Sequence, residues 1–218
     1  MTKQTILPRE RGRELTEQYR TLSAATVHEA MGRRGAVEGN LRPLNREMRL
    51  CGTALPVRCH PGDNLSLIKA ISLAEPGQVI VLDMGDKPQY APFGEVLMTE
   101  CRAKGLAGLV TNSCVRDTRE LIEAGFPVFS AGIGILGTVK VHRGTIGEPM
   151  SFGGVWVRPG DLVLGDADGL VIVPWEEAED VLARSRERME KEARVIRRLE
   201  QGESLFDIYG YQAIYEGQ

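Results

Sequence analysis

Residues 78–132 read QVIVLDMGDKPQYAPFGEVLMTECRAKGLAGLVTNSCVRDTRELIEAGFPVFSAG. Short apolar runs rich in β-branched residues predict buried strands at 78–84, 106–112 and 127–132. The segments between them, 95–105 and 117–125, have the composition of helices that end at glycine. Strand, helix, strand, helix, strand is the order typical of parallel α/β packing.

The chain before this stretch continues the same alternation. Residues 12–33 carry apolar side chains at helical spacing and predict two short helices. A strand is expected at 51–59 and a helix at 65–73. The turn at 61–64, Pro-Gly-Asp-Asn, lies between them and supplies an acidic or amide side chain to cap that helix.

The character of the sequence changes after residue 138. Short alternating runs broken by Gly and Pro predict β-hairpins and sheet edges up to Pro174, and a long charged helix is expected from Trp175 to about Glu200. We therefore predict an α/β fold, a single layered domain over 1–218 with a mainly parallel central sheet, additional β-hairpins and a C-terminal helical arm at 175–218.

Composition narrows the classes of function. The 218 residues include 27 basic and 30 acidic side chains, which leave a formal net charge of −3. Such a balance gives no general attraction to nucleic acid or to an anionic membrane. The first residues are charged, no apolar run could span a bilayer, and the four cysteines show no metal-ribbon spacing, so a cytoplasmic protein with reduced thiols is expected.

Acidic residues stand where two of the expected helices begin, and an arginine precedes the second of these helices. Glu95 follows a loop, and twenty residues separate it from the pair Arg116 and Asp117, which follows the next strand. Both places lie beyond the carboxyl ends of neighbouring strands, the edge at which open α/β sheets bind ligands. Asp117 and Glu120 are three residues apart and so share one helix face.

Carboxylates that converge on one point raise one another's pKa unless a cation compensates them. Oxygen ligands favour Mg²⁺ or Mn²⁺, and Mg²⁺ keeps several waters, so Glu95, Asp117 and Glu120 need not all touch the ion. Arg116 offers a planar fork for a substrate carboxylate. The alternative is local, because Asp117 and Glu120 are also the residue types that cap a helix, with Arg116 simply solvated.

Motifs along most of the chain strengthen the catalytic interpretation. They are TVHEAMGRRGAV (26–37), GDNLSLIKAI (62–71), GE (94–95), RDTRE (116–120), AGFPVF (124–129), GGVWVRPGDLVLGDADGLVIVP (153–174) and KEARVIRRLEQGESLFDIYG (191–210). With these motifs the chain resembles the family of 4-hydroxy-4-methyl-2-oxoglutarate and 4-carboxy-4-hydroxy-2-oxoadipate aldolases, together with the related regulators of ribonuclease activity.

The resemblance implies a divalent-metal-dependent aldolase of aromatic-compound degradation that releases pyruvate and decarboxylates oxaloacetate as a side reaction. It implies that Asp117 ligates Mg²⁺ or Mn²⁺ and that Glu95 and Glu120 hold the water shell of the metal. Arg116 would then bind the pyruvyl group. The backbone amides after Gly94, at Val96 and Leu97, would receive its carboxylate. No Schiff-base lysine is required.

The resemblance also implies a homotrimer, often doubled to a hexamer, with an acid supplied by the neighbour's C-terminal helix. Glu192 lies on a 4-3 spaced, mainly apolar seam of that helix, where a carboxylate needs a partner. We expect Glu192 to reach the adjacent site, with Glu190 as the second candidate. An ion pair between helices would explain Glu192 equally well.

Two other functions stay open, a protein that binds and masks a ribonuclease and a dedicated oxaloacetate decarboxylase. A nucleotide or methyl-donor site is not expected at residues 132–137, although they spell G-x-G-x-x-G, because β structure follows where a helix should begin. Residues 165–169, GDADG, are read as a turn, not as a calcium loop. His60 and His142 show no evident acid–base partner.

Overall fold

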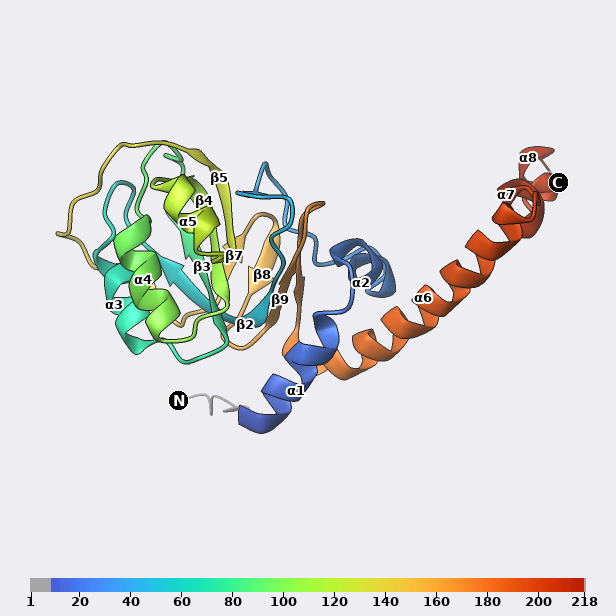
Figure 1. Cartoon of the computed structure of the whole chain (residues 1–218), viewed down its shortest axis with the longest axis horizontal. Helices are drawn as coiled ribbons and strands as arrows, with labels where there is room; N and C mark the ends of the chain where they lie inside the picture. Colours follow the sequence, from blue (N-terminus) through green and yellow to red (C-terminus); the bar gives the residue numbers. More distant parts are fainter. Residues whose placement is uncertain (1–8, 218) are drawn as a thin grey trace.

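An eight-stranded sheet forms the body of the chain (Figure 1). The computed structural model describes residues 9–217, so the first eight residues, which belong to the charged start of the sequence, lie outside the described part. The strand order is β1-β5-β4-β3-β2-β9-β10, with β6 paired to β2, while β7 and β8 form a separate hairpin. The strands are β1 (Arg42–Pro43), β2 (Leu50–Arg58), β3 (Gln78–Asp83), β4 (Gly108–Val115), β5 (Val128–Ile133), β6 (Thr145–Ile146), β7 (Met150–Phe152), β8 (Val155–Val157), β9 (Leu162–Gly165) and β10 (Leu170–Val173).

The sheet is mixed, so the prediction of a mainly parallel sheet is wrong. Strands β2, β3, β4 and β5 are parallel neighbours, as the alternation predicts. Strands β1, β6, β9 and β10 all join antiparallel to a neighbour. Connection length explains the β9–β10 pair. A parallel pair needs a long crossover, whereas the short turn between β9 and β10 permits only an antiparallel pair.

Three helices provide those crossovers and cover one face of the sheet. They are α3 (Leu65–Leu73), α4 (Glu95–Ala103) and α5 (Thr118–Glu123), and Figure 1 shows them side by side. Their apolar sides pack on β2, β3 and β4 in one continuous core that includes Ile71, Leu82 and Leu121, all fully buried. The hairpin β7–β8 covers the opposite face, where Phe152 packs with Phe129.

A second group of helices packs at the β9–β10 end of the sheet. Here α1 (Arg9–Tyr19), α2 (Ala24–Ala30) and the start of α6 (Ala178–Glu200) share a core, and the short helix η1 (Trp175–Glu177) leads into α6. The buried Tyr19 hydroxyl donates to the Ala178 carbonyl at 2.7 Å. The buried Asp166 carboxylate accepts from the Ala24 N–H at 2.8 Å, which ties α2 to the β9–β10 turn.

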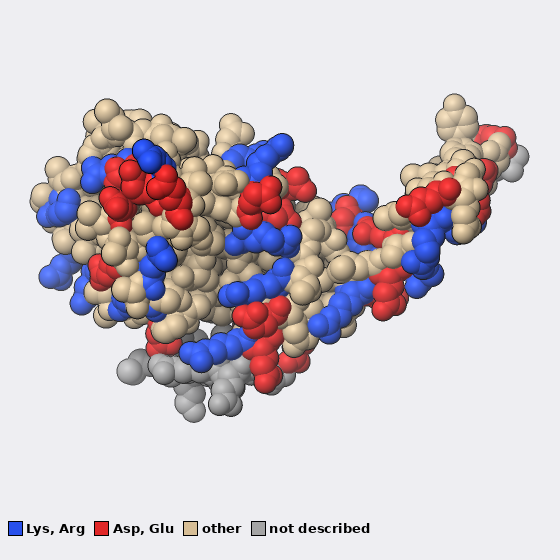
Figure 2. Space-filling view, in the orientation of Figure 1, with Lys and Arg blue, Asp and Glu red and all other residues tan. Residues whose placement is uncertain are grey.

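The long C-terminal helix that the sequence predicts is present and leaves the body as an arm (Figure 1). Helices α7 (Leu205–Ile208) and α8 (Gln212–Tyr215) follow at its tip. The first turns of α6 are buried, but Met189, Ile196 and Leu199 are exposed farther along the same seam. Acidic and basic side chains alternate along the arm (Figure 2). Among the described helices, none is long and apolar enough to cross a membrane.

Candidate active site

The carboxyl ends of the four parallel strands meet at one edge of the sheet, and four loops gather there. They are residues 59–64 after β2, 84–94 after β3, 116–117 after β4 and 134–144 after β5. Backbone hydrogen bonds join them, for example from Arg116 N–H to the Phe93 carbonyl and from Ala91 N–H to the Leu136 carbonyl. The edge where ligands are expected is therefore a connected layer of loops.

Asp117 has an unusual backbone and an unusual partner. Its φ of 53° and ψ of 43° lie in the left-handed region, where residues other than glycine are uncommon. It stands at the N-cap of α5 but makes no side-chain bond to that helix. Its Oδ2 instead accepts a hydrogen bond from the Glu95 N–H at 3.0 Å. The local capping alternative is thus wrong for α5, because the Asp117 carboxylate bonds to the first residue of the neighbouring helix α4 and not to its own helix.

Arg116 is held by its backbone while its side chain stays half-exposed. Its N–H donates to the Phe93 carbonyl at 3.0 Å, which fixes the residue against the loop before α4. Its Nε lies 3.6 Å from Asp117 Oδ2, and 47% of the side chain is exposed. A guanidinium has five N–H donors, so this arrangement leaves donors available for an anion in front of the pair.

Gly94 makes the close approach of these residues feasible. A Cβ built on Gly94 would lie 2.3 Å from Asp117 Oδ2 and 2.9 Å from Arg116 Cγ. The backbone of Gly94 is extended, so space and not conformation requires glycine here. The Asp117 carboxylate occupies the volume that any side chain at position 94 would fill.

The start of α4 offers two further donors beside this carboxylate. The first N–H groups of a helix have no partner within it. The N–H of Glu95 is used by Asp117, whereas within the described part of the chain those of Val96 and Leu97 have no acceptor. The Val96 side chain is 77% exposed, so the helix start faces solvent. Two free N–H groups at a helix N-terminus form a natural anion site.

Glu95 and Glu120 lie close in the chain to this point, but their carboxylates are not gathered around Asp117. Glu95 is exposed and Glu120 is half-buried, and neither forms an ion pair within residues 9–217. Over the same residues no group of three acidic, histidine or cysteine side chains could hold a metal. Both contacts of Asp117 use Oδ2, which leaves Oδ1 open. One open carboxylate oxygen suits an ion such as Mg²⁺ that keeps most of its waters.

A buried aspartate organises the loops at the β2 end of the same edge. Asp63 Oδ1 accepts from the Leu65 N–H and so caps α3, while Oδ2 accepts from the N–H groups of Val141 and His142 at 2.7 Å each. Burial alone would raise the pKa of Asp63, but these backbone hydrogen bonds outweigh it and lower the pKa to about 2. The expected β structure therefore begins later than residue 138, at β6, because residues 138–144 form a loop bound to Asp63.

The same aspartate gives His142 the partner that the sequence did not reveal. His142 Nδ1 lies 3.3 Å from Asp63 Oδ2, and the His142 and His60 rings are 5.1 Å apart. The expectation that His142 lacks an acid–base partner is wrong, since the two residues are 79 positions apart and meet only through the loop. His28 is a locally bonded histidine, with its Nδ1 3.0 Å from the Arg34 carbonyl oxygen.

Asn64 is a polar residue near the site to which the sequence assigned only a capping role. It stands at the N-cap of α3 without a side-chain cap bond. Its Nδ2 donates to the Pro92 carbonyl at 2.8 Å, two residues before Gly94, and its buried Oδ1 has no partner within the described chain. The signal was present in GDNL, where either Asp63 or Asn64 could cap, and only packing decides that Asp63 does.

Three of the four cysteines are buried thiols that contribute no nucleophile to this edge. All four are free, and Cys51, Cys59 and Cys101 are buried, as expected for reduced cysteines packed as small hydrophobes. Burial raises the pKa of Cys51 and Cys101 to about 12 and that of Cys59 to about 11. These three thiols stay protonated near neutral pH.

Glu192 lies on α6, and its carboxylate has a partner in its own chain. Arg188 Nη2 lies 2.9 Å from Glu192 Oε1, and Arg188 Nη1 lies 3.7 Å from Glu29 Oε2 on α2. The Glu192 side chain is 41% exposed, whereas Glu190 is exposed and forms no ion pair with another described residue. The ion pair of Glu192 within the chain therefore lies in its own helix α6, and it is Arg188 that reaches α2.

Of the two motifs that the sequence set aside, GDADG has the expected turn, whereas residues 138–144 form a loop where β structure was expected after residues 132–137. The glycines of residues 132–137 lead from β5 into the loop 134–144, and no helix follows. Residues 165–169 form the turn between β9 and β10, in which Asp166 N–H donates to the Gly169 carbonyl and Asp166 Oδ1 accepts from the Asp168 N–H. Neither segment has the architecture of the ligand site its letters suggest.

Known proteins match the chain over most of its length. Residues 24–172 match the family described as "RraA-like: Aldolase/RraA". A protein of Halalkalibacterium halodurans named "Putative 4-hydroxy-4-methyl-2-oxoglutarate aldolase" is 35% identical over 171 residues, which are 78% of this chain and 81% of that protein. The Streptomyces coelicolor structure RraAS2, titled a member of the RNase ES inhibitor RraA family, superposes with a TM-score of 0.72 at 26% identity and covers 83% of this chain and 96% of that one. The RNA-processing inhibitor RraA of Thermus thermophilis has a TM-score of 0.64 at 27% identity, over 69% and 92% of the two chains.

Proposed function

The chain belongs to the RraA-like family, and from that premise we propose that it is a divalent-metal-dependent carbon–carbon lyase. The proposed substrates are 4-hydroxy-4-methyl-2-oxoglutarate and 4-carboxy-4-hydroxy-2-oxoadipate, each cleaved to pyruvate and a second oxo acid in the degradation of aromatic compounds. Oxaloacetate decarboxylation is the proposed side reaction. The observation that carries the proposal is the Asp117 carboxylate fixed at 3.0 Å from the start of α4 beside the Arg116 guanidinium.

The arrangement supplies an anchor for the pyruvyl half of the substrate. The free N–H groups of Val96 and Leu97 would receive its carboxylate, because a helix N-terminus stabilises an anion. The half-exposed guanidinium of Arg116 would bind the adjacent oxo group and hold it in plane. Gly94 keeps this volume free of a side chain. These contacts orient the bond to be broken.

The open oxygen of Asp117 is the ligand that this chain would offer to Mg²⁺ or Mn²⁺, with Glu95 and Glu120 contacting the water shell. A divalent ion held there would supply Lewis-acid chemistry to the substrate. In the cleavage the carbon–carbon bond breaks, and its electron pair passes to the carbon that becomes the methyl group of pyruvate. The substrate hydroxyl loses its proton and becomes the oxo group of the second product. Arg116 would stabilise the negative charge that develops on the pyruvyl oxygen. Protonation of the carbon that received the electron pair then gives pyruvate.

We further propose that the working form is a homotrimer or hexamer in which Glu192 serves a neighbouring site, with Glu190 as the second candidate. Uncovered apolar side chains support association. Met189, Ile196 and Leu199 are exposed along the arm. The loop after β5 also exposes Ile135 at 91% and Val141 at 67%, although backbone hydrogen bonds hold it in place. Ordered apolar surface of this kind is typical of an interface.

A coupled assay for pyruvate release, with and without a chelator, tests the proposal. We expect activity that disappears with the chelator and returns with Mg²⁺ or Mn²⁺. Asp117→Ala should abolish it and Arg116→Ala should lower it by at least a hundredfold. Glu123→Ala, an exposed acid on the same helix paired with Arg119, is the matched control and should retain full activity. Undiminished turnover in Asp117→Ala would exclude this mechanism.

The assay also separates the alternatives. Turnover of oxaloacetate and of neither hydroxy-oxo acid would indicate a dedicated decarboxylase. A ribonuclease-masking protein is the second candidate, favoured by the structural likeness to the RraA inhibitors. It would release no pyruvate but would lower the rate of a ribonuclease in a titration.

The role of Glu192 has its own test in hybrid oligomers. Chains carrying Glu192→Ala and chains carrying Asp117→Ala are mixed after reversible dissociation and assayed for pyruvate release. If the acid acts across an interface, some sites in the mixture are intact and activity partly returns. The matched hybrid replaces Glu192→Ala by Glu187→Ala, which is exposed on the same helix. No recovery in the first mixture would assign Glu192 to its pair with Arg188 alone.

A further inference from the structure

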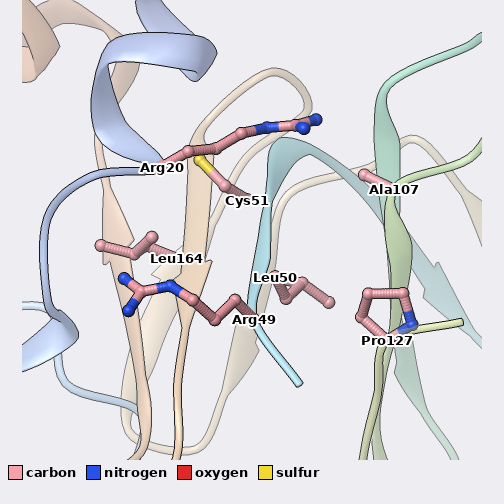
Figure 3. Close-up of a pocket in the computed structure, with 7 residues that line it drawn as sticks. All are labelled: Arg20, Arg49, Leu50, Cys51, Ala107, Pro127 and Leu164. Carbon is pink, nitrogen blue, oxygen red and sulfur yellow. The ribbon is translucent and has the colours of Figure 1, made fainter. Parts of the chain in front are cut away.

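A pocket lies at the opposite end of the parallel strands from Asp117. Its volume is about 270 Å³, and its lining comes from the starts of β2, β4 and β5, from β9 and from the end of α1. The lining residues are Arg20, Arg49, Leu50, Cys51, Ala107, Pro127 and Leu164, shown in Figure 3. The volume corresponds to about nine waters, which is room for a small organic molecule.

The walls of the pocket are apolar and its rim carries two cations. In Figure 3 the Arg20 side chain extends over the pocket toward Ala107, while Arg49 points to the Leu164 side. Arg49 is fixed by a hydrogen bond to the Leu22 carbonyl at 2.5 Å. Arg20 Nε has a weak, exposed partner, Glu17 Oε1 at 3.4 Å. Arg20 is therefore the cation that is free to turn toward a ligand.

Among the residues that the structure describes, no acidic side chain lines the pocket. None of its lining residues is acidic, and the Cys51 thiol, whose Sγ donates to the Thr16 carbonyl, stays neutral because burial raises its pKa to about 12. An apolar cavity with a cationic rim and no acid suits a ligand that has an apolar body and one anionic group.

We propose that this pocket binds a small organic acid, an aromatic or short aliphatic monocarboxylate. The carboxylate pairs with Arg20 in place of Glu17, and the apolar body lies against Leu50, Ala107 and Pro127. Arg49 adds positive charge without direct contact. This site is independent of the proposed catalytic one, since it lies at the other end of the strands.

Ligand-observed ¹⁹F NMR of 4-fluorobenzoate with the full chain tests the proposal, with 4-fluorobenzyl alcohol as the uncharged comparison. We expect saturable binding of the acid, at least tenfold weaker binding of the alcohol, and about a tenfold loss of acid affinity in Arg20→Gln. Arg46→Gln, an exposed arginine outside the pocket, should leave the affinity unchanged. Arg49→Lys should lower it by less than threefold.

Two further variants show whether the acid binds through Arg20 in this pocket or at the Arg116 site. Glu17→Gln removes the competitor for Arg20 and should tighten binding about twofold, an effect that a purely structural Arg20 would not produce. Arg116→Ala should bind 4-fluorobenzoate as the unchanged chain does, which separates this pocket from the proposed catalytic site. Equal binding of acid and alcohol, unchanged affinity in Arg20→Gln, loss of binding in Arg116→Ala or no saturable binding would each overturn the proposal.

Discussion

Asp63 and Asp117 lie at the same edge of the sheet, each just before a helix, yet their carboxylates are engaged in opposite ways. Asp63 is 1% exposed and accepts three backbone hydrogen bonds, one from the start of α3 and two from the loop after β5. Asp117 is 38% exposed at its side chain, accepts one backbone bond and leaves Oδ1 open. Both oxygens of the Asp63 carboxylate accept hydrogen bonds within the fold, whereas one oxygen of the Asp117 carboxylate is open to a ligand.

The backbone conformation also distinguishes Asp117 from Asp63. Asp117 is one of two non-glycine residues with positive φ among the described residues, a conformation that disfavours ordinary side chains. Strain of this kind persists where the surroundings determine it, often at functional sites. The comparison indicates that Asp63 supports stability and Asp117 supports chemistry. Substitutions at each residue test this difference in role.

The largest expected effect on stability is at Asp63. Asp63→Ala leaves the N–H groups of Leu65, Val141 and His142 without their acceptor, and the free energy of unfolding should fall by about 3 kcal/mol. Urea unfolding followed by circular dichroism measures the change. Asp86→Ala, an exposed acid in the next loop, is the control and should change stability by less than about 0.5 kcal/mol. A loss below about 1 kcal/mol at Asp63 would show that water replaces its bonds.

A somewhat smaller effect is expected where Gly94 meets Asp117. In Gly94→Ala the new Cβ would lie 2.3 Å from Asp117 Oδ2, so the carboxylate must move and stability should fall by about 2 kcal/mol. Pyruvate release should fall by at least tenfold with it. Gly137→Ala is the matched control, because a Cβ there meets nothing within 4 Å. Full activity in Gly94→Ala would mean that the position of Asp117 does not matter.

The backbone hydrogen bonds to the Asp63 carboxylate should also make stability depend on pH. The pKa of Asp63 is lowered to about 2 in the fold, so its contribution is present above the unfolded-state pKa near 4. That contribution is lost as pH falls from about 4 to 2. The amount is about 2 kcal/mol, since each unit of pKa shift corresponds to about 1.4 kcal/mol.

Urea midpoints at pH 5, 4, 3 and 2 test this dependence through the difference between the unchanged chain and Asp63→Asn, since other carboxylates titrate in both. The difference should shrink steadily below pH 4. A difference that stays constant down to pH 2 would show that the Asp63 pKa is ordinary.

The sequence predicted much of the fold because its signals are local. The apolar runs of β3, β4 and β5 and the helix at 65–73 are visible in the chain itself. The mixed sheet was not predictable in the same way. Strand β9 pairs with β2, more than 100 residues earlier, and a pairing over that distance is decided by packing and not by the pattern of either strand.

The candidate site, too, was predicted where the signal is local and missed where long-range packing decides. The spacing between Glu95 and Asp117 predicted that they approach each other, and the two residues do meet. The contact, however, joins the Asp117 carboxylate to the Glu95 N–H and not two side chains. That detail depends on Gly94, whose missing Cβ gives the carboxylate its place. Local spacing therefore predicted the neighbours, and tertiary packing determined which atoms touch.

The smallest expected effect on stability separates charge from geometry at Asp117. Asn tolerates the left-handed conformation and can still accept from the Glu95 N–H, so Asp117→Asn should change the free energy of unfolding by less than about 0.5 kcal/mol. What it loses is the exposed pair with Arg116, a kind of pair that contributes little. Asp180→Asn, which loses an exposed pair with Arg184, is the matched control. Titration with Mn²⁺ followed by electron paramagnetic resonance should then show binding in the unchanged chain and in Asp180→Asn but not in Asp117→Asn. If Asp117→Asn instead bound Mn²⁺ normally while losing more than about 1 kcal/mol, the roles of Asp63 and Asp117 would not differ, and Asp117 would be a structural cap.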